Sequence, residues 1–86
     1  MYISIGPLIT IKKEDIVGIF DLDTAAATKA TKDFLVSCEK KGGTVSALSP
    51  GELPKSFILT RSGKVYFSQY AARILRIRAK KLKNLF

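Results

Sequence analysis

The chain has 86 residues, a formal net charge of +8 and no histidine. Its length fits one small domain, residues 1–86, with a modest core. Without histidine, and with Cys38 as the sole cysteine, it lacks the side chains that most often serve acid–base catalysis, zinc binding and nucleophile pairs, so we expect neither an enzyme nor a cofactor.

Two short β-rich runs, at residues 2–5 and 8–11, come first along the chain. Gly6-Pro7 between them predicts a tight hairpin turn, because glycine permits the positive φ of such a turn and proline fixes φ at the next position. Residues 16–20 are continuously apolar, which predicts a strand that is buried on both faces.

A helix is predicted from Ala25 to about Lys41, because apolar residues recur there at helical spacing. Asp23-Thr24 is suited to cap its first turn, and Gly42-Gly43 is suited to end it. Cys38 lies on the apolar side of this helix, so we expect it in the core rather than as a reactive thiol.

Residues 44–48 alternate weakly and predict a short strand, whereas residues 49–54 carry two prolines and a glycine that break regular structure. A second hairpin follows, with strands at 56–60 and 64–68. With a helix over residues 70–86, this order predicts an α+β fold: a small antiparallel β-sheet domain with one central helix and a basic C-terminal helix.

Positive charge is concentrated in the last seventeen residues, which contain six Lys or Arg and no Asp or Glu. Arg73, Arg76, Lys80 and Lys83 form what we call the basic stripe. They are three, four and three residues apart, so at about 100° per residue they fall within an arc of roughly 80°. Such a stripe can neutralise phosphates, with an affinity that falls with salt and carries little sequence information. It predicts a surface for double-stranded DNA.

A basic helix also suits a merely solvated surface or an anionic membrane. Arg78 and Lys81 interrupt the apolar side of the helix and leave a poor face for insertion, which favours nucleic acid over lipid. Because an unpaired Arg78 is costly in a packed core, we expect this part of the helix to project beyond the domain or to meet an acidic partner. Lys55 and Arg61, at the ends of the second hairpin, extend the footprint if the fold places them on the same side.

Five segments together resemble a known family over roughly residues 1–80. They are Ile5-Gly6, Asp15-Ile16-Val17-Gly18-Ile19-Phe20-Asp21, Phe34-Leu35, Pro54-Lys55-Ser56 and Val65-Tyr66-Phe67-Ser68. In their order and spacing the chain resembles the Rem-type bacterial regulators of extracellular matrix and biofilm genes, and it is closer to the RemB branch than to RemA.

This resemblance implies a cytoplasmic DNA-binding regulator that acts as a ring-shaped homo-oligomer. In the RemA branch, a sheet-based protomer forms rings whose rim carries arginines for the DNA backbone. Repeated weak phosphate contacts then act together, because each bound copy raises the effective concentration of the next.

The chain departs from the RemA branch at two basic positions. Gly51-Glu52-Leu53 stands where that branch has Gly-Arg-Arg, and Asp15 aligns with another of its basic residues. Those DNA contacts are therefore not carried over. Lys55, in the shared Pro54-Lys55-Ser56 segment, is the basic group that remains nearby, and the C-terminal helix is the candidate substitute for the missing arginines.

We therefore predict a DNA-binding transcriptional regulator of matrix and biofilm genes that acts as a homo-oligomer. The predicted contact residues are Lys55, Arg61, Arg73, Arg76, Lys80 and Lys83. The alternatives are an oligomeric scaffold that does not bind DNA and a peripheral binder of anionic membrane; we expect no small-molecule substrate and no metal. One cysteine, no signal-peptide pattern and no membrane-spanning stretch predict a cytoplasmic protein.

Overall fold

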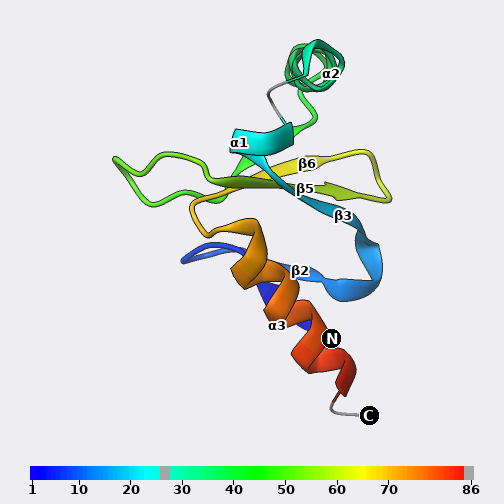
Figure 1. Ribbon diagram of the computed structural model, residues 1–86, viewed down its shortest axis with the longest axis vertical. Coiled ribbons are helices and arrows are strands. Elements are labelled where there is room, and N and C mark those ends of the chain that lie inside the picture. The colour runs from blue at the N-terminus through cyan, green and yellow to red at the C-terminus, as the bar shows by residue number, and fades with distance from the viewer. Residues whose placement is uncertain (26–27, 85–86) are drawn as a thin grey trace.

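The computed structural model describes residues 1–25 and 28–84, and for 24–25 and 81–84 it describes the backbone alone. The chain is an α+β domain, as predicted (Figure 1). Its strands are β1 (Tyr2–Ser4), β2 (Thr10–Lys12), β3 (Ile16–Asp21), β4 (Thr44–Ser46), β5 (Ser56–Thr60) and β6 (Val65–Ser68). Its helices are a 3-10 turn at Lys13–Asp15, α1 (Leu22–Ala25), α2 (Lys29–Lys40) and α3 (Ala72–Asn84).

The strands form two sheets rather than one. β1 and β2 make an antiparallel hairpin, and the other four strands form a sheet in the order β3-β5-β6-β4. β5 pairs antiparallel with both β3 and β6, but β4 pairs parallel with β6. The predicted antiparallel pairing is confirmed for β3, β5 and β6, and the parallel pairing of β4 is the exception. β3 and β4 run in the same direction on opposite edges, and parallel strands need a crossover such as the one that contains α2.

The four-stranded sheet lies between α2 on one face and α3 with the β1–β2 hairpin on the other (Figure 1). The buried core lies on the α3 side and consists of Ile3, Ile5, Ile11, Ala47, Ile58 and Leu75. Phe57 precedes Ile58 in β5 and is also buried. Because successive strand residues point to opposite faces, Phe57 serves the α2 side of the same sheet.

The central helix begins later than predicted. α2 starts at Lys29, where Thr28 Oγ1 accepts a hydrogen bond from the Thr31 N–H at 3.3 Å, so Asp23-Thr24 does not cap it. The predicted residues 26–27 lie outside the described part of the chain. The predicted end is confirmed, because Gly42 follows α2 with φ of +71°, a conformation that favours glycine.

The α2 helix covers its face of the sheet loosely. None of its residues is buried, and Cys38 is half-buried rather than in the core as predicted. Phe34 and Val36 are exposed. Figure 1 shows α2 standing above the sheet, joined to it by the segments that precede and follow it. The tightly packed side of the domain is therefore the α3 side.

β3 is an edge strand, so the prediction that residues 16–20 are buried on both faces is wrong. Val17 is 60% exposed and Phe20 is 38% exposed. The pairing with β5 shifts register between Ile16 and Gly18. Phe20 stacks on Phe57 with ring centroids 5.0 Å apart, which anchors the strand from one side only. The apolar residues of β3 are therefore explained by packing on β5, as in the stacking of Phe20 on Phe57, and not by burial on both faces.

The hairpin of β1 and β2 meets the sheet at Gly6. A Cβ at Gly6 would lie 2.9 Å from the Ala47 Cβ and 3.0 Å from the Ala47 carbonyl carbon. Ala47 has little room to move, because it is 3% exposed and its N–H donates to the Phe67 carbonyl at 2.9 Å. Glycine at position 6 is thus a requirement of packing between the two sheets.

We expect Gly6→Ala to lower the free energy of unfolding by about 1–3 kcal/mol, the usual cost of overpacking. Urea unfolding followed by circular dichroism measures it. Gly43→Ala is the matched control, since a Cβ there meets its nearest atom, the Cys38 carbonyl oxygen, at 3.4 Å. Equal unfolding midpoints for the two variants would show that the Gly6–Ala47 approach does not constrain the fold.

Candidate nucleic-acid interface

The α3 helix is attached to the domain along one face. Ala72 and Leu75 are buried, and Ala79 packs half-buried against the same core. Two buried serines hold the segment that enters the helix. Ser56 Oγ donates to the Tyr70 carbonyl at 2.8 Å, and Ser68 Oγ accepts from the Tyr70 N–H at 3.1 Å. The orientation of α3 about its own axis is therefore determined.

With that face held in the core, the basic stripe points outward. Arg73, Arg76 and Lys80 are all exposed, as predicted, and at about 100° per residue they fall within roughly 60° of one another. Lys83 lies in the last turn of α3, where the structure describes the backbone and not the side chain. The described part of the stripe is thus three cations on one helix face.

Two isoleucines lie on the exposed surface beside the stripe. Ile74 is 37% exposed and Ile77 is 49% exposed. The periodicity predicts Ile74 on the apolar side with Leu75, but Ala72 and Leu75 are the residues that turn fully into the core. The outward surface of α3 is consequently basic with an apolar strip rather than purely charged.

Arg76 has a second contact that its position in the sequence does not indicate. Its Nη2 atom donates a hydrogen bond of 2.8 Å to the backbone carbonyl of Ile19 in β3. This bond uses one of the five N–H donors of the guanidinium. Arg76 thus belongs to the exposed stripe and also joins α3 to the sheet.

Arg78 does not project beyond the domain, contrary to the prediction. Its Nη1 atom donates to the Ser4 carbonyl at 2.9 Å, and its guanidinium carbon lies 4.7 Å from the centre of the Tyr70 ring. A cation over an aromatic face is attracted by the ring quadrupole, and the carbonyl satisfies one donor. Arg78 is half-buried and acts as a clamp that joins α3 to Ser4 and Tyr70.

Lys55 and Arg61 flank β5 at its two ends and cannot serve one small surface together. The six-residue separation along a strand corresponds to roughly 20 Å. The Lys55 N–H donates to the Ser68 carbonyl at 2.8 Å, close to the segment that enters α3. Lys55 therefore lies at the same end of the sheet as Arg73.

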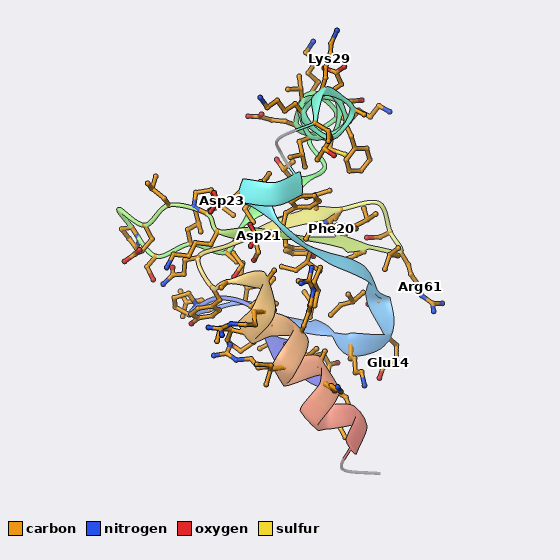
Figure 2. The ribbon with its side chains drawn as sticks, viewed as in Figure 1. Glu14, Phe20, Asp21, Asp23, Lys29 and Arg61 are labelled. Carbon is orange, nitrogen blue, oxygen red and sulfur yellow. The ribbon has the colours of Figure 1, made fainter. Side chains whose placement is uncertain are left out.

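Arg61 lies at the opposite end, in the turn between β5 and β6 (Figure 2). Its backbone N–H donates to the Asp15 carbonyl at 2.8 Å, and Glu14 lies on the same side of the molecule. The structure thus brings Arg73, Arg76 and Lys80 together, places Lys55 toward them and leaves Arg61 apart.

The first turn of α3 is electrostatically unfavourable. It contains no acidic residue and carries Arg73. The N-terminus of a helix bears partial positive charge, so a cation there destabilises rather than stabilises the helix, by about 0.3–1 kcal/mol. A bound anion reverses the sign of this contribution. The local electrostatics of α3 therefore favour an anionic partner.

The α3 helix contains no Asp or Glu that could neutralise its cations. The ion pair that the structure shows among the described residues joins the Met1 amino group to Glu14, at 3.6 Å. A hydrogen bond from the backbone of Glu14, with Met1 and Lys12 nearby, holds the pKa of that carboxyl below its usual value. The acidic side chain is thus engaged with the N-terminus rather than with the stripe.

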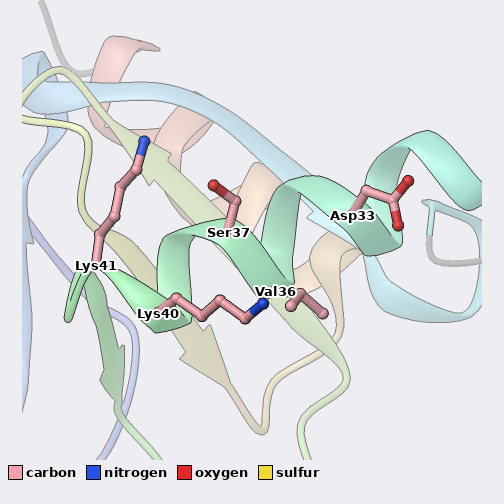
Figure 3. Close-up of a pocket in the computed structure, with 5 residues that line it drawn as sticks. All are labelled: Asp33, Val36, Ser37, Lys40 and Lys41. Carbon is pink, nitrogen blue, oxygen red and sulfur yellow. The ribbon is translucent and has the colours of Figure 1, made fainter.

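The outer side of α2 shows a different charge pattern. Figure 3 shows this side of the helix, where an open hollow of about 440 Å³ is lined by Asp33, Val36, Ser37, Lys40 and Lys41. This lining mixes both signs of charge with one apolar side chain, so it suits a polyanion less well than the stripe does. Within residues 1–25 and 28–84, no group of three His, Cys, Asp or Glu side chains is arranged to hold a metal ion.

No protein-family model and no curated protein matches the chain. None of the helices in the described ranges has the length and apolar character needed to cross a lipid bilayer. The resemblance to the Rem-type regulators accordingly stays a prediction from the sequence.

We expect Arg78→Ala to destabilise the protein by about 1–2 kcal/mol, because it removes one charge-assisted hydrogen bond and one cation–π contact. Arg73→Ala removes the same charge from an exposed position of the same helix and should leave the unfolding free energy unchanged or raise it by up to about 1 kcal/mol, because it relieves the unfavourable charge at the helix N-terminus. Thermal unfolding of both variants tests this. If Arg73→Ala costs as much as Arg78→Ala, the assignment of Arg78 as a clamp is wrong.

Proposed function

We propose that this protein is a cytoplasmic DNA-binding regulator that acts as a homo-oligomer through repeated contacts to the phosphate backbone. The observation that carries the proposal is the exposed arrangement of Arg73, Arg76 and Lys80 on a helix whose opposite face is buried in the core. A cationic surface held rigidly in this way needs no ordering of the helix on binding. Matrix and biofilm genes are the targets that the resemblance to the Rem-type family implies.

The length of the stripe supports weak binding by one copy and strong binding by several. Arg73 and Lys80 are seven residues apart, which is about 10 Å along a helix axis. Phosphates of one DNA strand recur every 3.4 Å or so along the duplex axis, so one copy spans roughly three of them. Affinity for a regulatory site then requires several linked copies, because each bound copy raises the effective concentration of its neighbours.

Anionic membrane is the second candidate partner, favoured by the exposure of Ile74 and Ile77 beside the stripe. Two isoleucines provide little apolar area for insertion. The main apolar face of α3, at Ala72 and Leu75, is already buried against the sheet and cannot also enter lipid. Phosphate recognition at a DNA surface uses the cations without needing that face, so DNA is preferred.

We expect binding to a mixed-sequence duplex to weaken steeply between about 50 and 200 mM salt. The double variant Arg73→Gln/Lys80→Gln should lower the log–log salt slope by roughly 1.8, or 0.9 for each lost phosphate contact. This double variant keeps Arg76 and its hydrogen bond to the Ile19 carbonyl of β3. Fluorescence anisotropy of a labelled duplex measures both quantities.

The matched control is Lys40→Gln/Arg61→Gln, which removes the same charge from exposed positions on α2 and the β5–β6 turn. The log–log salt slope of this control for duplex binding should stay close to that of the wild type. Equal losses in the two double variants would mean that net charge, and not the stripe, determines binding. Binding to phosphatidylserine vesicles without binding to duplex would identify the membrane instead, and an oligomer that binds neither would be a scaffold.

A further inference from the structure

Within the described part of the chain, β3 has a hydrogen-bonded neighbour strand on one side only, because it is the first strand in the order β3-β5-β6-β4. The pairing pattern shows which of its backbone groups face the other side. Leu22 N–H donates to the Lys55 carbonyl at 3.0 Å, and this pair continues the register of Phe20 with Phe57 and of Ile19 with Ile58. Hydrogen-bonded and non-bonded pairs alternate in an antiparallel ladder. Ile19 is therefore in a non-bonded pair, and its N–H and C=O point to the outer edge.

Arg76 occupies the carbonyl of this outward pair. Its Nη2 atom donates to the Ile19 oxygen at 2.8 Å, across 57 positions of the sequence. An edge strand presents a row of donors and acceptors that can pair with another strand, and charged side chains are a common means of preventing this. The guanidinium of Arg76 therefore blocks the edge at the middle of the six-residue strand β3.

The Val17 side chain in β3 suits an interface better than it suits water. It is 60% exposed, although it is a β-branched apolar residue in a strand of high β-propensity. Two identical strands can pair antiparallel about a two-fold axis, with each satisfying the outward groups of the other through the same residues. A second copy of this chain is thus a partner whose own β3 can form the hydrogen bonds that the outer edge offers.

We propose that the outer edge of β3 is the surface through which two copies of this chain pair, and that Arg76 closes it until an anion takes its guanidinium. In the free protein two effects keep copies apart: the hydrogen bond from Arg76 to Ile19 and the repulsion between two chains of net charge +8. Phosphate groups weaken both, because they bind the guanidinium and neutralise positive charge. The proposal rests on the proposed function only for the identity of the anion, since the edge itself exists without DNA.

Sedimentation velocity over a series of concentrations tests the edge in the absence of DNA. Arg76→Ala should form a dimer at about 100-fold lower concentration than the wild type, because each of the two copies no longer has a hydrogen bond of ordinary strength to break, and each bond corresponds to about ten-fold. Arg73→Ala, with the same change of charge on the same helix, should behave as the wild type. Adding Val17→Lys to Arg76→Ala should restore the monomer, because a lysine on an edge strand opposes pairing.

A short duplex tests the release by phosphate. The wild type should bind it as pairs, and Val17→Lys, which leaves the basic stripe unchanged, should bind it as single copies. The proposal is overturned if Arg76→Ala associates no better than Arg73→Ala, or if its association survives Val17→Lys. A wild type that ignores the duplex refutes the proposed function, while the Arg76→Ala series still decides whether the edge pairs. If Arg76→Ala does not fold, the duplex experiment with Val17→Lys alone decides: single copies support pairing at β3, and pairs refute it.

Discussion

The burial of Leu75 against Ile58 and the β1–β2 hairpin is the contact on which the rest of the molecule depends. A helix with one face in a core can rotate very little, so the fully buried Leu75 determines the direction of every other side chain on α3. The stripe points outward for that reason. In an 86-residue chain the core is small, and burying this face of α3 is a large part of what stabilises the domain. Charge presentation and stability therefore come from the same contact.

The helices α2 and α3 show how differently one sheet can be covered. α2 has no buried residue, and its outer side carries both Asp33 and Lys40. α3 is clamped by Arg78 and by the buried serines that precede it. A surface that is already ordered binds a polyanion more tightly, because no binding free energy is lost in ordering it. The α3 helix is held in place in this way, and α2 is not.

Local and periodic features are predictable from the sequence, and non-local ones are not. The end of α2 at Gly42 and the outward stripe follow from spacing and from the preferences of glycine. The first hairpin is also predicted, but the reason given for Gly6 is wrong, because Gly6 does not adopt a positive φ and is instead required by its contact with Ala47. The parallel pairing of β4 with β6 depends on a crossover, which no short window reveals. The contacts of Arg76 and Arg78 join residues 57 and 74 positions apart, so the sequence shows the charges but not their acceptors. The position of Arg61 at a hairpin end is predictable, but its distance from α3 requires the strand order.

Arg76 has two roles that compete for one guanidinium. Its bond to the Ile19 carbonyl stabilises a single chain, whereas a phosphate offers two acceptor oxygens in the fork geometry that arginine prefers. A carbonyl is a neutral acceptor and a phosphate is charged, so in a desolvated contact the phosphate forms the stronger bond. Moving Arg76 away from β3 has a cost, because the Ile19 carbonyl at the strand edge must then find another donor. In a single chain, water can donate to the Ile19 carbonyl. In a pair of chains, the β3 strand of each copy can donate to the Ile19 carbonyl of the other. Binding of an anion at α3 and pairing at β3 are thus linked through one side chain, and each makes the other more favourable.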